Sequence, residues 1–256
     1  MEILTNKLPS GGYGYGFPSV NILPMTFKEV VGYTENCPSD PLSKYLFDMR
    51  NLIKDDPNIE QCYIMDIDYL IFAKKILTVS QDLSLNITVT CPECGKKIDK
   101  KVYIQELEYT AVDPNIMEGG TIELFNNAYE YSVPTYGSFM KVFDNYLRYR
   151  TIDDLDLIKL ISMINEFHVY PNRIENLVLN ARYDDITALL ALKELYLEKV
   201  KPIELYCPIC NKGLKGEERR KITVSTKGLI VDFFREIVKY NPISSTKIQF
   251  KQIRQS

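Results

Sequence analysis

The sequence predicts an α+β fold made of two similar halves, each with helices and a small antiparallel β-hairpin that carries a CPxC zinc knuckle. The first observation is a repeated cysteine motif, because CPEC at residues 91–94 recurs as CPIC at residues 207–210. The second is the order of the patterns around each motif, which is an apolar helical run, a short strand, the cysteine pair and another strand. The third is a hydrophobic content of 45%, which is enough to form a sizeable core.

The same elements recur in the same order in both halves. Asp68 is expected to begin an apolar helix in the first half, and Asp184 begins the matching one in the second. Acidic residues at helix starts satisfy free backbone N–H groups and the helix dipole. Asp40 followed by Pro41 predicts another helix start, because proline at the first helical position loses no hydrogen bond. We interpret the repeat as an internal duplication. Short strands are expected beside the cysteine pairs, at residues 85–90, 101–104, 203–206 and 221–224.

Glycine, proline and tyrosine positions suggest the domain boundaries. Glycine and tyrosine alternate from Gly11 to Gly16, which predicts an arm that becomes ordered on a partner. Breaker residues in 113–120 predict a connection between the halves. The predicted division is a flexible arm at 1–16, a first repeat with the CPEC knuckle at 17–109, a linker at 110–120, a second repeat with the CPIC knuckle at 121–240, and a C-terminal tail at 241–256.

The cysteine pairs are candidate metal ligands. Zinc in structural sites takes four tetrahedral ligands, and one CxxC turn supplies two of them. Neither half has a full set alone, so we expect Cys91, Cys94, Cys207 and Cys210 to share one structural Zn²⁺. Thiolate ligands favour zinc over magnesium or calcium.

Two other interpretations of the cysteines stay open. A dithiol oxidoreductase would use CxxC at a helix N-terminus, where the dipole lowers the thiol pKa. The pairs could also be reduced and empty, left from an ancestral metal site. Cys37 and Cys62 lack partners at ligand spacing and are expected to pack as ordinary apolar residues.

Catalytic motifs are missing from the sequence. It contains no GxxxxGK[ST] phosphate loop, no GxSxG and no HExxH. The one histidine, His168, is expected to be a packing residue, so most acid–base schemes lack their usual base. We therefore expect no enzymatic activity and no small-molecule substrate.

Charge and hydropathy limit the partners. The net charge is −3, with basic residues spread along the chain, so nucleic acid is not an expected partner. No apolar run reaches the roughly 18–20 residues of a membrane helix, so no membrane partner is expected. The first ten residues lack the features of a secretory signal, which predicts a cytoplasmic protein.

Several short motifs follow one another in the first half. An LPS start at residues 8–10 leads into a glycine–aromatic stretch, then into NILPMT at 21–26, an Asp-led helix and the TCPEC knuckle at 90–94. In this order they resemble the baseplate hub assembly proteins of T-even-type contractile-tailed bacteriophages, over roughly residues 8–108. The second CPIC half departs from that pattern, because shorter relatives are expected to carry one copy.

The resemblance implies a non-enzymatic component or assembly factor of a virus tail baseplate, in its hub region. Its partners would be other phage baseplate and hub proteins, and further copies of the chain could also be partners. The protein would act in the host cytoplasm during assembly and could remain in the virion tail baseplate.

The alternative is a zinc-ribbon-like nucleic-acid or transcription accessory protein. It would need a basic face beside the knuckles. The residues that could form this face are Lys96, Lys97, Lys100, Lys101, Lys212, Lys215, Arg219, Arg220 and Lys221.

Overall fold

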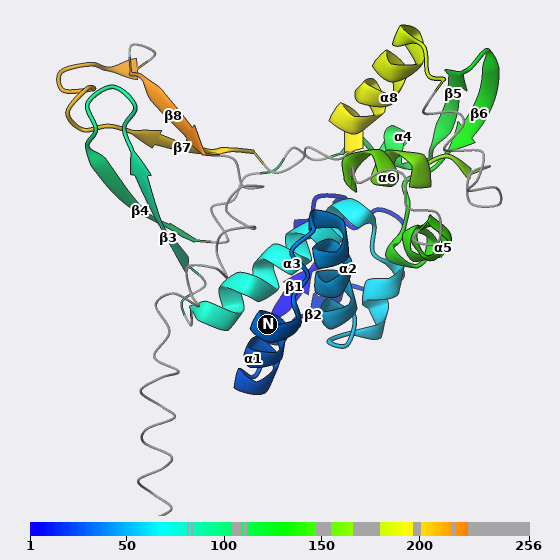
Figure 1. Cartoon of the computed structure of the whole chain (residues 1–256), viewed down its shortest axis with the longest axis horizontal. Helices are drawn as coiled ribbons and strands as arrows, with labels where there is room; N and C mark the ends of the chain where they lie inside the picture. Colours follow the sequence, from blue (N-terminus) through cyan, green and yellow to red (C-terminus); the bar gives the residue numbers. More distant parts are fainter. Residues whose placement is uncertain are drawn as a thin grey trace, which may run out of the picture.

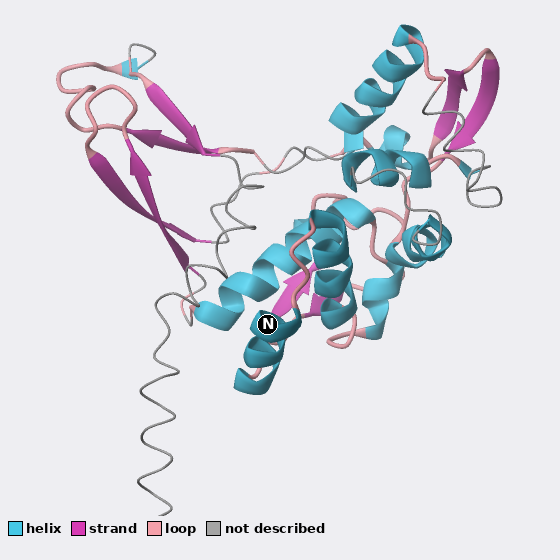
Figure 2. Cartoon of the chain, viewed as in Figure 1, coloured by secondary structure: helices cyan, strands magenta, loops and turns pink. Residues whose placement is uncertain are grey.

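The computed structural model describes residues 1–80, 82, 84–103, 109, 112–146, 155–165, 180–196, 201–216 and 219–224. Within these ranges the chain combines helices with four two-stranded antiparallel sheets, as expected for an α+β protein (Figures 1 and 2). The predicted tail at 241–256 and His168 lie outside the described residues. No helix in the described part of the chain is long and apolar enough to cross a bilayer.

The N-terminal part begins with a hairpin and continues with helices. Thr26 caps the first of these helices, where its side chain and that of Glu29 form a reciprocal capping box. Asp40 caps the second helix, which begins at Pro41 and confirms the predicted start. The elements are β1 (Glu2–Leu4), the 3-10 turn η1 (Thr5–Lys7), β2 (Ser19–Asn21), α1 (Phe27–Asn36), α2 (Pro41–Leu52), the 3-10 turn η2 (Pro57–Gln61) and α3 (Ile64–Val79).

Helix α3 starts earlier than the sequence predicted. It begins at Ile64, so Asp68 lies in its second turn and does not cap it. Instead, the Asp68 carboxylate pairs with Lys159 at 2.8 Å and accepts a hydrogen bond from the Tyr45 hydroxyl at 2.7 Å. The expectation that Asp68 opens the helix was therefore wrong, because the apolar run extends back to Ile64.

The predicted flexible arm at 1–16 is part of the fold. Residues of β1 pair with β2, and Leu8 is fully buried. The Ser10 N–H and Oγ both donate to the buried carboxylate of Asp66, at 2.8 and 2.6 Å. The Tyr15 hydroxyl donates to the same carboxylate at 2.6 Å and accepts from the Tyr63 N–H. The prediction of a mobile arm was wrong because these glycines shape a turn that covers a buried acid.

The C-terminal part repeats the arrangement of a hairpin followed by helices. Phe125 and Asn126 both have positive φ, which suits the two-residue turn that joins its hairpin strands. Asp113 caps a helical turn whose Met117 is buried, so part of the predicted linker packs within this part. The elements are α4 (Pro114–Met117), β5 (Gly120–Leu124), β6 (Asn127–Tyr131), α5 (Tyr136–Tyr146), α6 (Leu155–Ser162) and α8 (Tyr183–Tyr196).

Two further hairpins carry the cysteine pairs and are called here the cysteine hairpins. The first is formed by β3 (Ser84–Thr90) and β4 (Lys97–Tyr103), and the second by β7 (Ile203–Tyr206) and β8 (Lys221–Val224). All four predicted strands are therefore confirmed, two of them with the same bounds. The two hairpins lie side by side, apart from the α4–α8 region (Figure 1).

Two buried clusters hold the chain together. The first core joins residues of β1, β2, α2 and α3 to the cysteine hairpins and to α5, through residues such as Phe139 and Leu205. The second core joins α4, β5, α6 and α8, and it also takes Met65 from α3. Both cores thus contain residues from both predicted halves.

The Tyr15 hydroxyl provides a test of the docked N-terminal segment. We expect Tyr15→Phe to lower the free energy of unfolding by about 2 kcal/mol, because it leaves the Tyr63 N–H without its acceptor and Asp66 with one donor fewer. Urea denaturation measures this change. Tyr13→Phe is the matched control, since its hydroxyl bonds Glu118 at an exposed position. Equal stabilities for the two variants would contradict the docked arrangement.

Candidate metal centre

The first cysteine turn is fixed by its backbone. Cys91 follows β3 directly, and its N–H donates to the Lys96 carbonyl at 2.8 Å. The Gly95 N–H donates to the Cys91 carbonyl at 3.0 Å. Gly95 has φ of +69°, a left-handed conformation that glycine adopts without strain. The proline and glycine of this motif therefore suit a tight turn that directs Cys91 and Cys94 to one side.

The second cysteine turn repeats this geometry. The Asn211 N–H donates to the Cys207 carbonyl at 3.0 Å, which is the bond that Gly95 makes in the first turn. The Asn211 side chain also accepts from the Arg220 N–H at 2.6 Å and donates to the Arg220 carbonyl at 3.1 Å. These bonds connect the turn to the start of β8 and stabilise the longer loop between the second cysteine pair and that strand.

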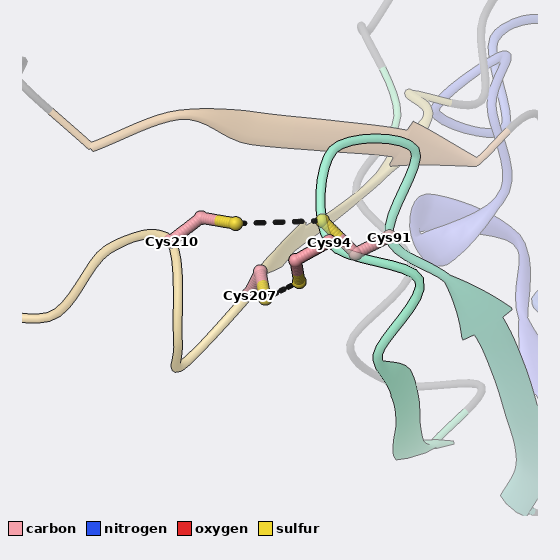
Figure 3. Close-up of side chains that lie close together, drawn as sticks. All are labelled: Cys91, Cys94, Cys207 and Cys210. Atoms are coloured by element: carbon pink, nitrogen blue, oxygen red, sulfur yellow. Dashed lines mark hydrogen bonds between the residues drawn. The ribbon is translucent and has the colours of Figure 1, made fainter.

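The two turns bring all four cysteine sulfurs together, as Figure 3 shows. The Sγ atoms of Cys91 and Cys210 are 3.8 Å apart, and those of Cys94 and Cys207 are 3.5 Å apart. All four Sγ atoms lie within 4.8 Å of one another. Zn–S bonds of about 2.3 Å in a tetrahedron place sulfurs roughly 3.8 Å apart, whereas a disulfide needs about 2.05 Å. The arrangement therefore fits one tetrahedral metal ion better than two disulfides.

The site is buried on one side and open on the other. Cys91 and Cys207 are buried, Cys210 is half-buried and Cys94 is exposed. Metal ions can therefore reach the sulfurs from the side of Cys94. Around the site, the Glu93 carboxylate pairs with Arg220, which links the first turn to the second hairpin. The Lys100 ammonium adds a second link by donating to the Glu204 carbonyl at 3.3 Å.

Backbone hydrogen bonds tune the thiols. The N–H groups of Cys210 and Ile209 lower the pKa of Cys207 to about 7, and they outweigh the opposing effect of burial. The pKa of Cys210 is raised, first by its hydrogen bond with the Cys94 side chain and then by burial. The Lys96 N–H acts to lower the pKa of Cys94, but burial and the thiols of Cys207 and Cys91 leave it raised overall. N–H groups directed at sulfur stabilise thiolate, the form that binds metal.

The redox interpretation has less support from this geometry. A reactive CxxC pair lies at the N-terminus of a helix, whose dipole stabilises the thiolate. Here each pair leads through a turn into a strand, β4 or β8. A candidate metal ligand set therefore describes these cysteines better than a dithiol.

The two remaining cysteines lie apart from the candidate metal centre. Cys62 is fully buried in the first core and Cys37 is half-buried, and neither belongs to the four-sulfur group. Their predicted exclusion from the ligand set is consistent with these positions. The Glu93–Arg220 pair was missed, because two charges so far apart in sequence have no local pattern that connects them.

Metal content tests the site directly. We expect about one zinc ion per chain in native protein, and loss of that ion together with thermal stability in Cys207→Ser, because three sulfurs leave the tetrahedron incomplete. Elemental analysis and thermal unfolding measure both effects. Cys37→Ser serves as the control and is expected to retain its zinc. Protein purified without chelator that contains no zinc, or a Cys207→Ser variant that keeps it, would contradict this assignment.

The thiol pKa values also predict how zinc binding responds to pH. Above pH 7, the raised pKa values of Cys94 and Cys210 mean that binding must displace at least two protons. Apparent affinity should then fall by at least roughly 100-fold per unit as pH drops from about 8 to 7. The dependence steepens below the Cys207 pKa of about 7, where one further proton must leave. Competition with a chromophoric chelator measures this, and a pH-independent affinity would exclude thiolate ligands.

Comparison with known protein families, curated proteins and solved structures finds no match for this chain.

Proposed function

We propose that this chain is a non-enzymatic component or assembly factor of a contractile phage tail baseplate, in the hub region, stabilised by one structural zinc ion. One observation carries the structural-ion part of the proposal: two CPxC turns from distant parts of the chain bring four sulfurs within 4.8 Å of one another. Metal binding there would fix the two cysteine hairpins against each other. A protein that nucleates an ordered assembly needs such rigidity in the surfaces it presents.

The ligand set favours a structural ion over a catalytic one. Catalytic zinc sites have three protein ligands and leave one position for water or substrate. Here Cys91, Cys94, Cys207 and Cys210 would fill all four positions. Zinc bound in this way would contribute to folding and supply no activated water.

Internal duplication is the second part of the proposal, and the order of elements supports it. Each half has a hairpin, helices and then a cysteine hairpin in the same succession. The best matched pair is Asp66 and Asp185, which are the third residues of α3 and α8 and replace the pair Asp68 and Asp184 that the sequence predicted. The Asp66 carboxylate accepts from the Ser10 N–H at 2.8 Å, and that of Asp185 accepts from the Phe125 N–H at 2.7 Å. Each donor lies between the two strands of the hairpin that opens its half.

The baseplate assignment rests on the resemblance of the N-terminal motifs. Their positions support treating them as one folded unit. Leu8 and Ser10 of the LPS start are buried, and Ser10 donates to Asp66 of α3. The Met25 N–H, within NILPMT, donates to Thr78 of the same helix at 3.0 Å. Motifs that are far apart in sequence thus meet around α3.

Nucleic-acid binding is a second candidate, and the charge of the cysteine hairpins favours it. Residues 84–103 and 201–224 contain ten Lys and Arg against five Asp and Glu, although the whole chain is acidic. Some of these cations are already paired, namely Lys101 with Asp82, Lys221 with Glu204 and Arg220 with Glu93. The basic residues that the structure places here are exposed, which suits contacts with phosphates.

Isolation of tail intermediates tests the proposed function. We expect a tagged chain, expressed in infected cells, to co-sediment with baseplate hub intermediates, because assembly requires direct contact with hub proteins. Cys207→Ser should reduce this association, whereas Cys37→Ser should not. Mass spectrometry of gradient fractions measures both.

Two results would contradict the assignment. One is normal tail assembly in cells that lack the chain, together with its absence from every intermediate. The other is tight binding of DNA or RNA by the purified chain that weakens steeply with salt, which would favour the second candidate.

A further inference from the structure

Helix α8 has apolar residues on a buried side and on an exposed side. Leu189 and Leu192 are buried in the second core. On the outer face, Tyr183, Ile186 and Leu190 are between 46% and 82% exposed. Their spacing of three and four residues places them on one side of the helix. Exposed apolar side chains that are grouped on one side of a helix mark an interaction surface, so the outer face of α8 is expected to contact a partner.

Helix α3 provides the comparison. If Asp66 and Asp185 are equivalent, then Ile64, Ile67 and Ile71 of α3 correspond to the three exposed residues of α8. These isoleucines are at most 5% exposed. The same helix face is therefore buried in the first half and open in the second.

The start of α5 is one of the elements that meets α3. The Ile64 N–H donates to the Pro134 carbonyl at 3.0 Å, and the Tyr136 N–H donates to the Cys62 carbonyl at 2.8 Å. Tyr136 itself is 7% exposed and lies in the first core. The start of a helix from the second half is thus inserted beside the start of α3.

Helix α1 is the counterpart of α5, and its start is exposed. Thr26 and Thr135 each precede their helix and accept the N–H three residues later, both at 3.3 Å. Phe27 therefore corresponds to Tyr136, but Phe27 is 62% exposed. Leu23 adds a second exposed apolar side chain just before the helix.

Among the described residues, one apolar helix start and one apolar helix face are thus exposed, although their counterparts in the other half are buried. Figure 1 shows α1 and α8 far apart, so a chain cannot join its own two surfaces. We propose that a second copy of this chain joins them, with Leu23 and Phe27 of one copy packing on Tyr183, Ile186 and Leu190 of the next. This contact would repeat, between copies, the internal contact of α5 with α3. It rests on the duplication included in the proposed function.

Such a contact is heterologous, because two different surfaces meet. Each copy then keeps one surface available for a further copy, and growth stops only if the rotation closes a ring. Because both contacting surfaces belong to this chain, the purified protein is expected to self-associate without any other partner.

Analytical ultracentrifugation of the zinc-loaded full chain tests this inference. Wild-type protein is expected to form dimers and larger species as its concentration rises. Phe27→Glu and Ile186→Glu should each weaken self-association by roughly 30-fold or more, because a charge enters an apolar contact. Mixing the two variants should restore a 1:1 complex that does not grow, since each variant keeps the surface that the other lacks. Tyr103→Glu is the control, because Tyr103 is exposed on β4, outside both surfaces.

The outcomes separate this inference from the proposed function. Monomeric wild-type protein at every concentration would overturn the inference, even with zinc present and hub association intact. Dimers that Ile186→Glu prevents but Phe27→Glu does not would also overturn it, because they indicate a symmetric contact through α8 alone. Loss of zinc or of hub association would instead contradict the proposed function. Circular dichroism of each variant confirms that the substitutions leave the fold intact.

Discussion

Burial of α3 on nearly all of its sides is the constraint that organises the structure. Its Asp66 accepts the hydrogen bonds that dock the N-terminal segment, and its Asp68 pairs with Lys159 of α6. Further along, Lys74 and Lys75 pair with Asp55 and Asp48 at buried positions. Because buried charges are costly unless they are paired, each of these bonds fixes the position of another element. Helix α3 also contributes to both cores, so its loss would separate the two parts of the molecule.

The cysteine hairpins form a second connection, remote from α3 in sequence but attached to the same core. Ile87 and Leu205 are buried in the first core, while the turns beyond them carry the sulfurs. Apolar packing alone would hold these short hairpins weakly, because isolated two-stranded hairpins are marginal in water. A shared metal ion would add the missing constraint at their tips. Packing therefore positions the hairpins, and the proposed ion would fix their mutual orientation.

The candidate site could be predicted from sequence more completely than the fold around it. Four cysteines in two identical spacings are a strong local signal, and β7 was predicted from the repeated order of patterns around them. The docked N-terminal segment was missed because its glycines and tyrosines suggest mobility, and only the distant Asp66 makes them ordered. The start of α3 was placed too late for a related reason. Asp68 resembles a first-turn acid locally, and its partner Lys159 lies 91 residues away.

The separation of the cysteine pairs has a consequence for synthesis of the chain on the ribosome. Cys94 and Cys207 are 113 residues apart. At ordinary translation rates, roughly 6 to 23 s therefore pass between synthesis of the first cysteine pair and synthesis of the second. During that interval the nascent first half holds two ligands, which is half of a site. Only a chain translated through Cys210 can complete the set. A product terminated before Cys210 therefore lacks this connection, and the four-cysteine group is complete only in chains translated beyond that point.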